Sequence, residues 1–144
     1  MKKKTLLFVC VQNSCRSQMA EGLARVLGKD IVEPYSAGSK PASIINPKAV
    51  KVMQEKNIDI SRQKPKGFEE LPFEKFDYVV TLGCGEQCPF VEAKHRVDWI
   101  IKDPKGRDMA FFRKVRDEIT LNLLKLMDDI RTPAQGKGSH GKTF

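Results

Sequence analysis

Short apolar runs alternate with segments of helical periodicity along most of the chain. Four of these runs have the length and composition of β-strands, and we expect strands at residues 5–10, 32–37, 77–82 and 96–101. The first run is apolar on both faces, which is typical of a strand inside a parallel sheet. The second contains Pro34, which cannot donate a ladder hydrogen bond and therefore favours an edge position.

Three helices are expected around these strands. Apolar residues recur at the helical period from Ser17 to Leu27, and Gly28 follows where a helix commonly ends. Asn46 and Pro47 are typical of an N-terminal cap and a first helical position, so they predict a second helix. The last helix carries an unbroken apolar stripe at the 3.6-residue period, made of Phe112, Val115, Ile119, Leu123, Leu126 and Ile130.

This order of elements predicts a small doubly wound α/β domain with a parallel sheet. We expect one domain over residues 1–131 and a disordered basic tail over 132–144, because the tail has almost nothing to bury. Ligands of such sheets bind outside the carboxyl ends of the strands. The polar segments after the first, third and fourth strands should therefore meet at one edge, at residues 10–16, 84–88 and 103–104.

The distribution of charge narrows the class of protein. The formal net charge is +8, but most of it lies in three lysines at the start of the chain and in the basic tail. The body carries no basic stripe, so we expect no nucleic-acid partner. The apolar run after the first lysines is short for a signal peptide, and no segment has the length of a transmembrane helix. We therefore expect a cytosolic protein that binds no membrane, and we take it to be a monomer.

The segment CVQNSCR places Cys10 and Arg16 at the two ends of a loop between the first strand and the first helix. Such a loop can direct backbone N–H groups inward as an anion nest, and the helix dipole reinforces it. Arg16 would add a bidentate guanidinium group, and Ser17 could donate a hydrogen bond to a Cys10 thiolate. The sequence thus predicts a nucleophilic thiol beneath an oxyanion held by Val11, Gln12, Asn13, Ser14, Cys15, Arg16 and Ser17.

Several motifs in combination resemble the low-molecular-weight phosphotyrosine phosphatase fold, and NSCRSQMAEG resembles its arsenate reductase branch. They are VCVQNSCRSQMAEG at 9–22, YSAG at 35–38, NPKAV at 46–50, VVTLGCGEQCP at 79–89, DW at 98–99 and DPKG at 103–106. The resemblance covers about residues 5–130. It implies a four-stranded parallel sheet with helices on both faces, and a thioredoxin-coupled enzyme whose substrate is arsenate, with phosphate as an analogue.

The resemblance also implies how the cysteines act. Cys10 would attack arsenic while Asp103 protonates the departing oxygen. Cys84 would then form a disulfide with Cys10 as arsenite leaves, and Cys88 would move that disulfide outward. Thioredoxin or a similar dithiol protein would restore the thiols, and no cofactor is expected. The implied catalytic set is Cys10, Arg16, Cys84, Cys88 and Asp103.

The resemblance also implies four residues that support the loop: Asn13, Ser17, Glu21 and Ser36. Three of them, Asn13, Glu21 and Ser36, match positions that in some relatives line a monovalent cation site. The acid that completes that site is absent here, and the segment RQKPKG offers Lys64 and Lys66 instead. A lysine ammonium group can replace the ion, so we expect no bound metal and no potassium requirement. Cys15 has no place in the relay, and we expect it to be a bystander.

Two other functions stay open at this point. A low-molecular-weight protein tyrosine phosphatase would use the same loop through a cysteinyl-phosphate intermediate. Enzymes of that branch commonly carry tyrosines after the Asp-Pro pair, and DPKGRDM has none, so we expect only weak phosphatase activity. A zinc-binding module could use the four cysteines, but their spacings are not those of CxxC knuckles, and an arginine beside the metal would be unfavourable.

Overall fold

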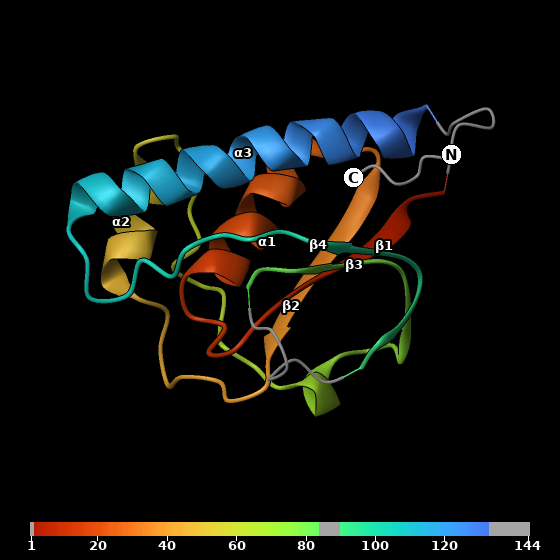
Figure 1. The fold of residues 1–144 in the computed structure, drawn as a ribbon, viewed down its shortest axis with the longest axis horizontal. Coiled ribbons are helices and arrows are strands. Elements are labelled where there is room, and N and C mark those ends of the chain that lie inside the picture. The colour runs from red at the N-terminus through yellow and green to blue at the C-terminus, as the bar shows by residue number, and fades with distance from the viewer. Residues whose placement is uncertain (1, 84–89, 133–144) are drawn as a thin grey trace.

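A sheet of parallel strands forms the centre of the computed structural model, which describes residues 2–83 and 90–132 of the 144-residue chain. The elements are, in order, β1 (Lys4–Cys10), α1 (Arg16–Leu27), β2 (Val32–Gly38), α2 (Pro47–Gln54), the 3-10 helix η1 (Phe68–Glu70), β3 (Lys75–Thr81), β4 (Glu92–Asp98) and α3 (Met109–Arg131). The described strands lie in the order β2-β1-β3-β4 (Figure 1). The predicted fold class is confirmed.

The register of the strands brings their carboxyl ends to one edge. Cys10 pairs with Gly38 across β1 and β2, and Val9 pairs with Thr81 across β1 and β3. Thr81 in turn pairs with Asp98 at the end of β4. The loops that follow β1, β3 and β4 therefore start at the same level, which is the level at which ligands bind in parallel sheets.

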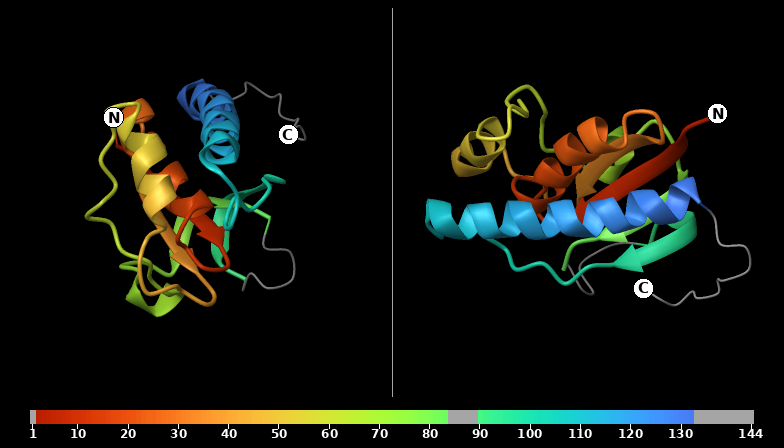
Figure 2. Two further views of the ribbon diagram at one scale, coloured as in Figure 1. Left: turned by 90° about the vertical axis from the view of Figure 1, so that its left-hand side faces the viewer. Right: turned by 90° about the horizontal axis from the view of Figure 1, so that it is seen from above.

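The described α-helices pack on one face of the sheet (Figure 2). The predicted stripe of α3 is buried throughout and shares a core with α1, α2 and the sheet residues Leu6, Phe8 and Val80. The other face, which carries Leu7 and Val79, is covered by η1 and its flanking segment. Helices thus lie on both faces, but on the second face the described residues form only a short 3-10 helix.

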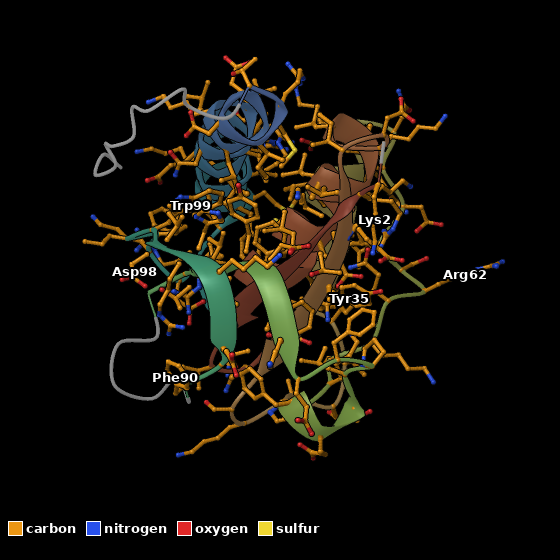
Figure 3. The ribbon with its side chains drawn as sticks, turned by 90° about the vertical axis from the view of Figure 1, so that its right-hand side faces the viewer. Lys2, Tyr35, Arg62, Phe90, Asp98 and Trp99 are labelled. Carbon is orange, nitrogen blue, oxygen red and sulfur yellow. The ribbon has the colours of Figure 1, made fainter. Side chains whose placement is uncertain are left out.

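Edge strands explain where the sequence prediction of the sheet succeeds and fails. Pro34 lies in the edge strand β2, as expected. The prediction of the fourth strand at 96–101 was wrong, because β4 spans Glu92–Asp98. Its side chains are mostly exposed and polar, and only Val97 is buried. Figure 3 shows Asp98, the last residue of this strand. The apolar residues that suggested a strand instead follow β4. Among them, Trp99 packs on Phe8 with 6.2 Å between the ring centroids.

Helix α3 is the longest described element, at 23 residues. Asp108 caps its start by accepting a hydrogen bond from the backbone N–H of Phe111 at 3.0 Å. Within the described part of the chain, no helix is both long enough and apolar enough to cross a membrane. The tail predicted over 132–144 lies beyond the described residues from position 133 onward.

Candidate active site

The loop between β1 and α1 turns its carbonyl groups away from the site. Each accepts a hydrogen bond at 2.9 or 3.0 Å from outside the loop: Val11 from Lys40 N–H, Gln12 from Ala42 N–H, Asn13 from the Gln18 amide and Ser14 from Asn46 N–H. In a trans peptide the N–H points opposite to the carbonyl. The N–H groups of residues 12–15 therefore point into the site, next to the N-terminus of α1 at Arg16.

Asn13 fixes the shape of this loop from behind. Its backbone φ of 53° is left-handed, a conformation that few residues other than glycine adopt. Its Oδ1 accepts hydrogen bonds from the backbone N–H of Lys66 at 2.9 Å and from Gln18 Nε2 at 3.0 Å. Since the Lys66 N–H can only donate, the amide orientation of Asn13 is settled, and its Nδ2 donates to Ser17 Oγ at 2.6 Å.

Cys10 lies at the base of the site, at the end of β1, and is only 3% exposed. Its Sγ is 2.8 Å from Ser17 Oγ. Because Ser17 already accepts a hydrogen bond from Asn13, its own hydroxyl hydrogen is free to donate to a Cys10 thiolate. The geometry supplies the hydroxyl donor that the sequence suggested.

Arg16 joins three loops. Its Nη1 donates to the backbone carbonyls of Leu82 at 2.5 Å and Ile101 at 3.0 Å, and its Nη2 lies 3.7 Å from Asp103 Oδ2. Its Nε is buried and has no partner among the described residues. A buried donor without an acceptor is costly, and a bound oxyanion would satisfy it.

Gly83 is required for this position of the guanidinium group. Its φ of +91° is left-handed, and an added Cβ would lie 3.0 Å from Arg16 Nη1 and 3.2 Å from the Ile101 carbonyl oxygen. Any side chain at Gly83 would therefore press on Arg16 as well as strain the backbone.

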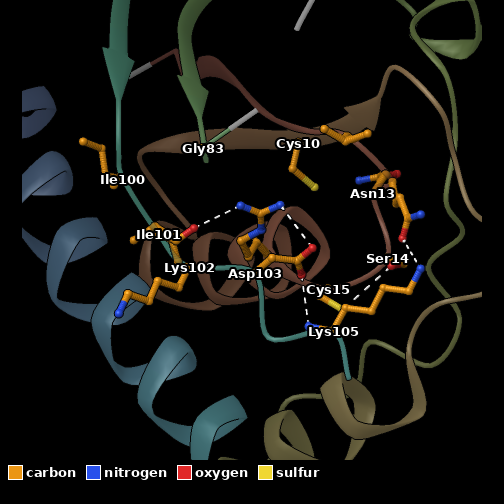
Figure 4. A pocket seen from close by; sticks show the side chains of 13 residues that line it. Cys10, Asn13, Ser14, Cys15, Gly83, Ile100, Ile101, Lys102, Asp103 and Lys105 are labelled. Atoms are coloured by element: carbon orange, nitrogen blue, oxygen red, sulfur yellow. Dashed lines mark hydrogen bonds and ion pairs between the residues drawn. The ribbon is translucent and has the colours of Figure 1, made fainter. Parts of the chain in front are cut away.

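A pocket of about 580 Å³ opens above Cys10, lined by the β1–α1 loop, by Gly83 and by residues 100–103 and 105 (Figure 4). Asp103 lies on the wall opposite the loop, with its side chain half exposed. Its Oδ1 accepts a hydrogen bond from the backbone N–H of Lys105 at 3.1 Å, while its Oδ2 faces Arg16. The structure thus brings Cys10, Arg16 and Asp103 around one cavity.

Cys15 is buried at the end of the same loop but in a different environment. Burial raises the pKa of the Cys15 thiol to about 11, so it stays protonated at neutral pH. A protonated thiol is a poor nucleophile. The raised pKa supports the prediction that Cys15 is a bystander.

Glu21 and Ser36 form a separate cluster behind the loop. Glu21 Oε1 accepts a hydrogen bond from Ser36 Oγ at 2.5 Å and lies 3.9 Å from Lys66 Nζ, while Oε2 pairs with Arg25 at 2.7 Å. Lys66 Nζ also donates to the carbonyl of Lys64 at 3.1 Å. An ammonium group therefore faces this carboxylate, and of the two lysines considered it belongs to Lys66.

Two findings complete the list of candidate residues. Gln18 was missed by sequence reasoning, although it is fully buried and its Nε2 bonds to Asn13 and to the Lys64 carbonyl. Its only signal was a glutamine directly after Ser17 in a segment that is otherwise a helix core.

The predicted relay residues Cys84 and Cys88 lie outside the described residues.

An interior parallel strand ends in a cysteine, the loop after it ends in an arginine, and an aspartate lines the same pocket. These features define a class of enzymes that use a thiol to act on bound oxyanions. The chain belongs to the low molecular weight phosphotyrosine protein phosphatase family, whose sequence pattern matches residues 5–135.

Within this family the chain is similar to proteins named arsenate reductases. It is 46% identical over 129 residues to the arsenate reductase of Halalkalibacterium halodurans, covering 83% of this chain and 91% of the relative. It is 40% identical over 119 residues to the glutaredoxin arsenate reductase of Synechocystis, covering 81% and 90%.

Solved structures give the same result. An arsenate reductase in the phosphate-binding state superposes with a TM-score of 0.81 at 37% identity, covering 88% of this chain and 98% of that one. The thioredoxin-dependent arsenate reductase of Corynebacterium glutamicum superposes with a TM-score of 0.73 at 34% identity, covering 90% of this chain and 62% of that one.

Proposed function

We propose that the chain is an arsenate reductase, which converts arsenate to arsenite with electrons from a dithiol protein. The observation that carries this proposal is the position of Cys10 Sγ at the base of a pocket where the buried Nε of Arg16 has no partner among residues 2–83 and 90–132. Similarity to arsenate reductases over more than four-fifths of the chain supports the same substrate.

Binding would use the groups that the loop directs inward. Arsenate is a tetrahedral oxyanion, and its oxygens would accept hydrogen bonds from the N–H groups of residues 12–15 and from Arg16. Arg16 Nη1 already serves the carbonyls of Leu82 and Ile101, so Nε and Nη2 are the donors left for the oxyanion. The arsenic atom would then lie above Cys10 Sγ.

The first chemical step would form a bond between Cys10 sulfur and arsenic. The Cys10 thiolate attacks As(V), and one arsenate oxygen leaves as water after Asp103 protonates it. Asp103 is suited to this role because it lies on the pocket wall opposite the loop and is half exposed, so solvent can restore its proton. Ser17 stabilises the Cys10 thiolate before attack and again when it is released.

Reduction would follow from a second thiolate, that of Cys84. It attacks Cys10 sulfur, the sulfur–arsenic bond breaks, and the electron pair of that bond goes to arsenic, which leaves as As(III) in arsenite. Cys88 then attacks Cys84 sulfur, so that Cys10 departs as a thiolate and the disulfide lies between Cys84 and Cys88. The two cysteines lost two electrons in total, and a dithiol protein returns them.

We further propose thioredoxin or a similar dithiol protein as the donor, because a disulfide between two neighbouring cysteines is an ordinary substrate for dithiol exchange. One similar structure is named thioredoxin-dependent, and one relative is named a glutaredoxin arsenate reductase. The need for reduced thiols places the proposed reaction in the cytosol. We propose that a monomer is the acting unit, because Cys10, Arg16 and Asp103 of a single chain line the same pocket.

Cys88→Ser separates the relay from the first reduction. We expect one equivalent of arsenite per enzyme in a rapid burst, followed by steady turnover about a hundredfold slower than wild type, because the Cys10–Cys84 disulfide has no exit. The measurement is arsenite formed with thioredoxin and its reductase, resolved into burst and steady phases. Normal turnover of Cys88→Ser would show that the outward relay is wrong.

Arsenite formation and aryl phosphate hydrolysis, measured on the same wild-type protein, distinguish a reductase from a phosphatase. A wild-type chain that formed no arsenite but rapidly hydrolysed aryl phosphates would be a phosphatase. We expect instead arsenite formation with weak aryl phosphate hydrolysis, because the loop recognises the tetrahedral shape of both anions.

The cluster around Glu21 predicts how the enzyme responds to potassium. Since the Lys66 ammonium group already faces the Glu21 carboxylate, the Michaelis constant for arsenate should be the same in potassium and sodium chloride at equal ionic strength. Lys66→Met should raise it about threefold, and potassium should restore part of the loss. Lys64→Met is the matched control, because Lys64 contacts the cluster through its carbonyl. Tighter arsenate binding by the wild type in potassium would contradict the prediction.

A further inference from the structure

Two side chains from different loops are hydrogen-bonded across the mouth of the active-site pocket. Lys105 Nζ, from the loop after β4, donates to Gln12 Oε1, from the loop after β1, at 3.0 Å. Both residues line the pocket together with Cys10. Figure 4 shows the Lys105 side chain reaching from beside Asp103 toward the loop that carries Ser14. We call this contact the Gln12–Lys105 bridge.

The backbone around Lys105 directs its side chain over the pocket. The Pro104 carbonyl accepts a hydrogen bond from the Arg107 N–H at 2.9 Å, and Gly106 has a φ of +81°, which is the pattern of a type II turn with Lys105 at its first corner. The Lys105 N–H also holds Asp103 Oδ1 at 3.1 Å. Lys105 therefore begins a turn directly after the proposed general acid and is hydrogen-bonded to it through the backbone.

The charges at the mouth favour one kind of ligand. Lys102 and Lys105 are exposed and line the pocket, and among the described residues Asp103 is the one carboxylate that lines it. A free tetrahedral oxyanion presents a charged oxygen toward this mouth. A phosphate monoester presents there a neutral, bulky alkyl or aryl group instead. A cation hydrogen-bonded across the opening attracts the first ligand and obstructs the second.

We propose that the Gln12–Lys105 bridge sets the specificity of the pocket for free oxyanions over aryl monoesters. The Lys105 ammonium group contacts the outward oxygen of a bound arsenate or phosphate ion. The bridge occupies the space through which the aromatic group of an aryl phosphate would leave the pocket. That arsenate is the substrate rests on the proposed function. The role of the Gln12–Lys105 bridge concerns only which ligands the mouth of the pocket admits.

Lys105→Met tests both halves of this proposal, because it removes the charge and keeps most of the length. We expect arsenate and phosphate to bind about three- to tenfold more weakly, measured as protection of the Cys10 peptide from iodoacetamide alkylation by mass spectrometry. The kcat/KM for p-nitrophenyl phosphate should rise about threefold or more, mainly through a lower KM, because the ring now meets an apolar and movable side chain. The affinity for the free oxyanions thus falls while the kcat/KM for the aryl phosphate rises.

Lys102→Met is the matched control, since it removes the same charge from the same pocket. It should weaken the binding of arsenate and of phosphate by about twofold, and added salt should suppress this effect. The kcat/KM for the aryl phosphate should not rise. Gln12→Ala breaks the bridge and keeps the ammonium group. It should therefore raise aryl phosphate turnover and lower the affinity for arsenate less than Lys105→Met does.

Equal responses of Lys105→Met and Lys102→Met, or no gain of aryl phosphate turnover in either bridge variant, would overturn the proposal. Failure of the reductase assignment would look different. In that case the wild type would form no arsenite, while the protection by arsenate and its change in Lys105→Met could still follow the pattern expected here.

Discussion

Cys10→Ser should abolish arsenite formation and aryl phosphate hydrolysis together, with a loss of about 10⁴-fold or more in each. The physical reason is that both reactions start with the same attack by Cys10 sulfur, and a serine hydroxyl remains protonated where a thiol can ionise. Cys10 packs in the core through a side chain of nearly the same size as serine, so the thermal melting temperature should fall by only a few degrees. Steady-state assays of both reactions and a melting curve provide the measurement.

Cys15→Ser is the control for this experiment. It makes the same atomic exchange five positions along the same loop, and burial keeps the pKa of Cys15 at about 11, so no thiolate is lost at neutral pH. We expect kcat/KM within about threefold of wild type. A Cys10→Ser variant that kept a substantial part of either activity, or a Cys15→Ser variant that lost both while folded, would mean that the nucleophile has been assigned to the wrong sulfur.

Arg16→Lys should lower kcat/KM for arsenate by about 10³-fold although the positive charge is kept. A lysine has neither the planar fork nor an equivalent of the buried Nε, so it cannot satisfy an oxyanion and the carbonyls of Leu82 and Ile101 at once. Leaving those buried carbonyls without donors should also destabilise the fold, by about 2–4 kcal/mol. Urea denaturation measures the second effect and arsenite formation the first.

Arg113→Lys makes the same exchange on α3, where Arg113 pairs with Glu55 at 3.0 Å at the surface. It should leave both the stability and kcat/KM close to those of the wild type, because an exposed ion pair contributes little. If Arg16→Lys behaved like Arg113→Lys, the guanidinium group of Arg16 would not be the centre of the oxyanion site.

The meeting of Cys10, Arg16 and Asp103 could be predicted from the sequence because it depends on topology. Each residue lies at or after the carboxyl end of a strand, and parallel strands put those ends at one edge whatever the details of packing. The cap of α2 was equally predictable, since Asn46 Oδ1 accepts from the N–H of Lys48 at 2.9 Å, a contact between near neighbours in the sequence.

The position of β4 could not be obtained from hydrophobicity. Its strand is an exposed edge with one buried side chain, Val97, whereas the apolar residues beyond it serve the site. Ile101 is buried and offers its carbonyl to Arg16, but Ile100, which also lines the pocket, is 90% exposed. Apolar residues at a pocket rim carry the same sequence signal as a strand.

Contacts between distant side chains were also beyond prediction. The Gln12–Lys105 bridge joins residues 93 positions apart, and each residue alone is an ordinary polar residue in a loop. The role of Gln18 depends on carbonyl groups whose directions only the folded backbone defines.

The left-handed Asn13 has a consequence for the energetics of ligand binding. Its side chain is fastened by Ser17, Gln18 and the Lys66 backbone, so the entropy of ordering the loop is lost when the chain folds and not when an anion arrives. A flexible loop would have to lose that freedom at each binding event, at the expense of affinity. The loop is thus preorganised, and the binding of an anion does not have to supply the free energy of ordering it.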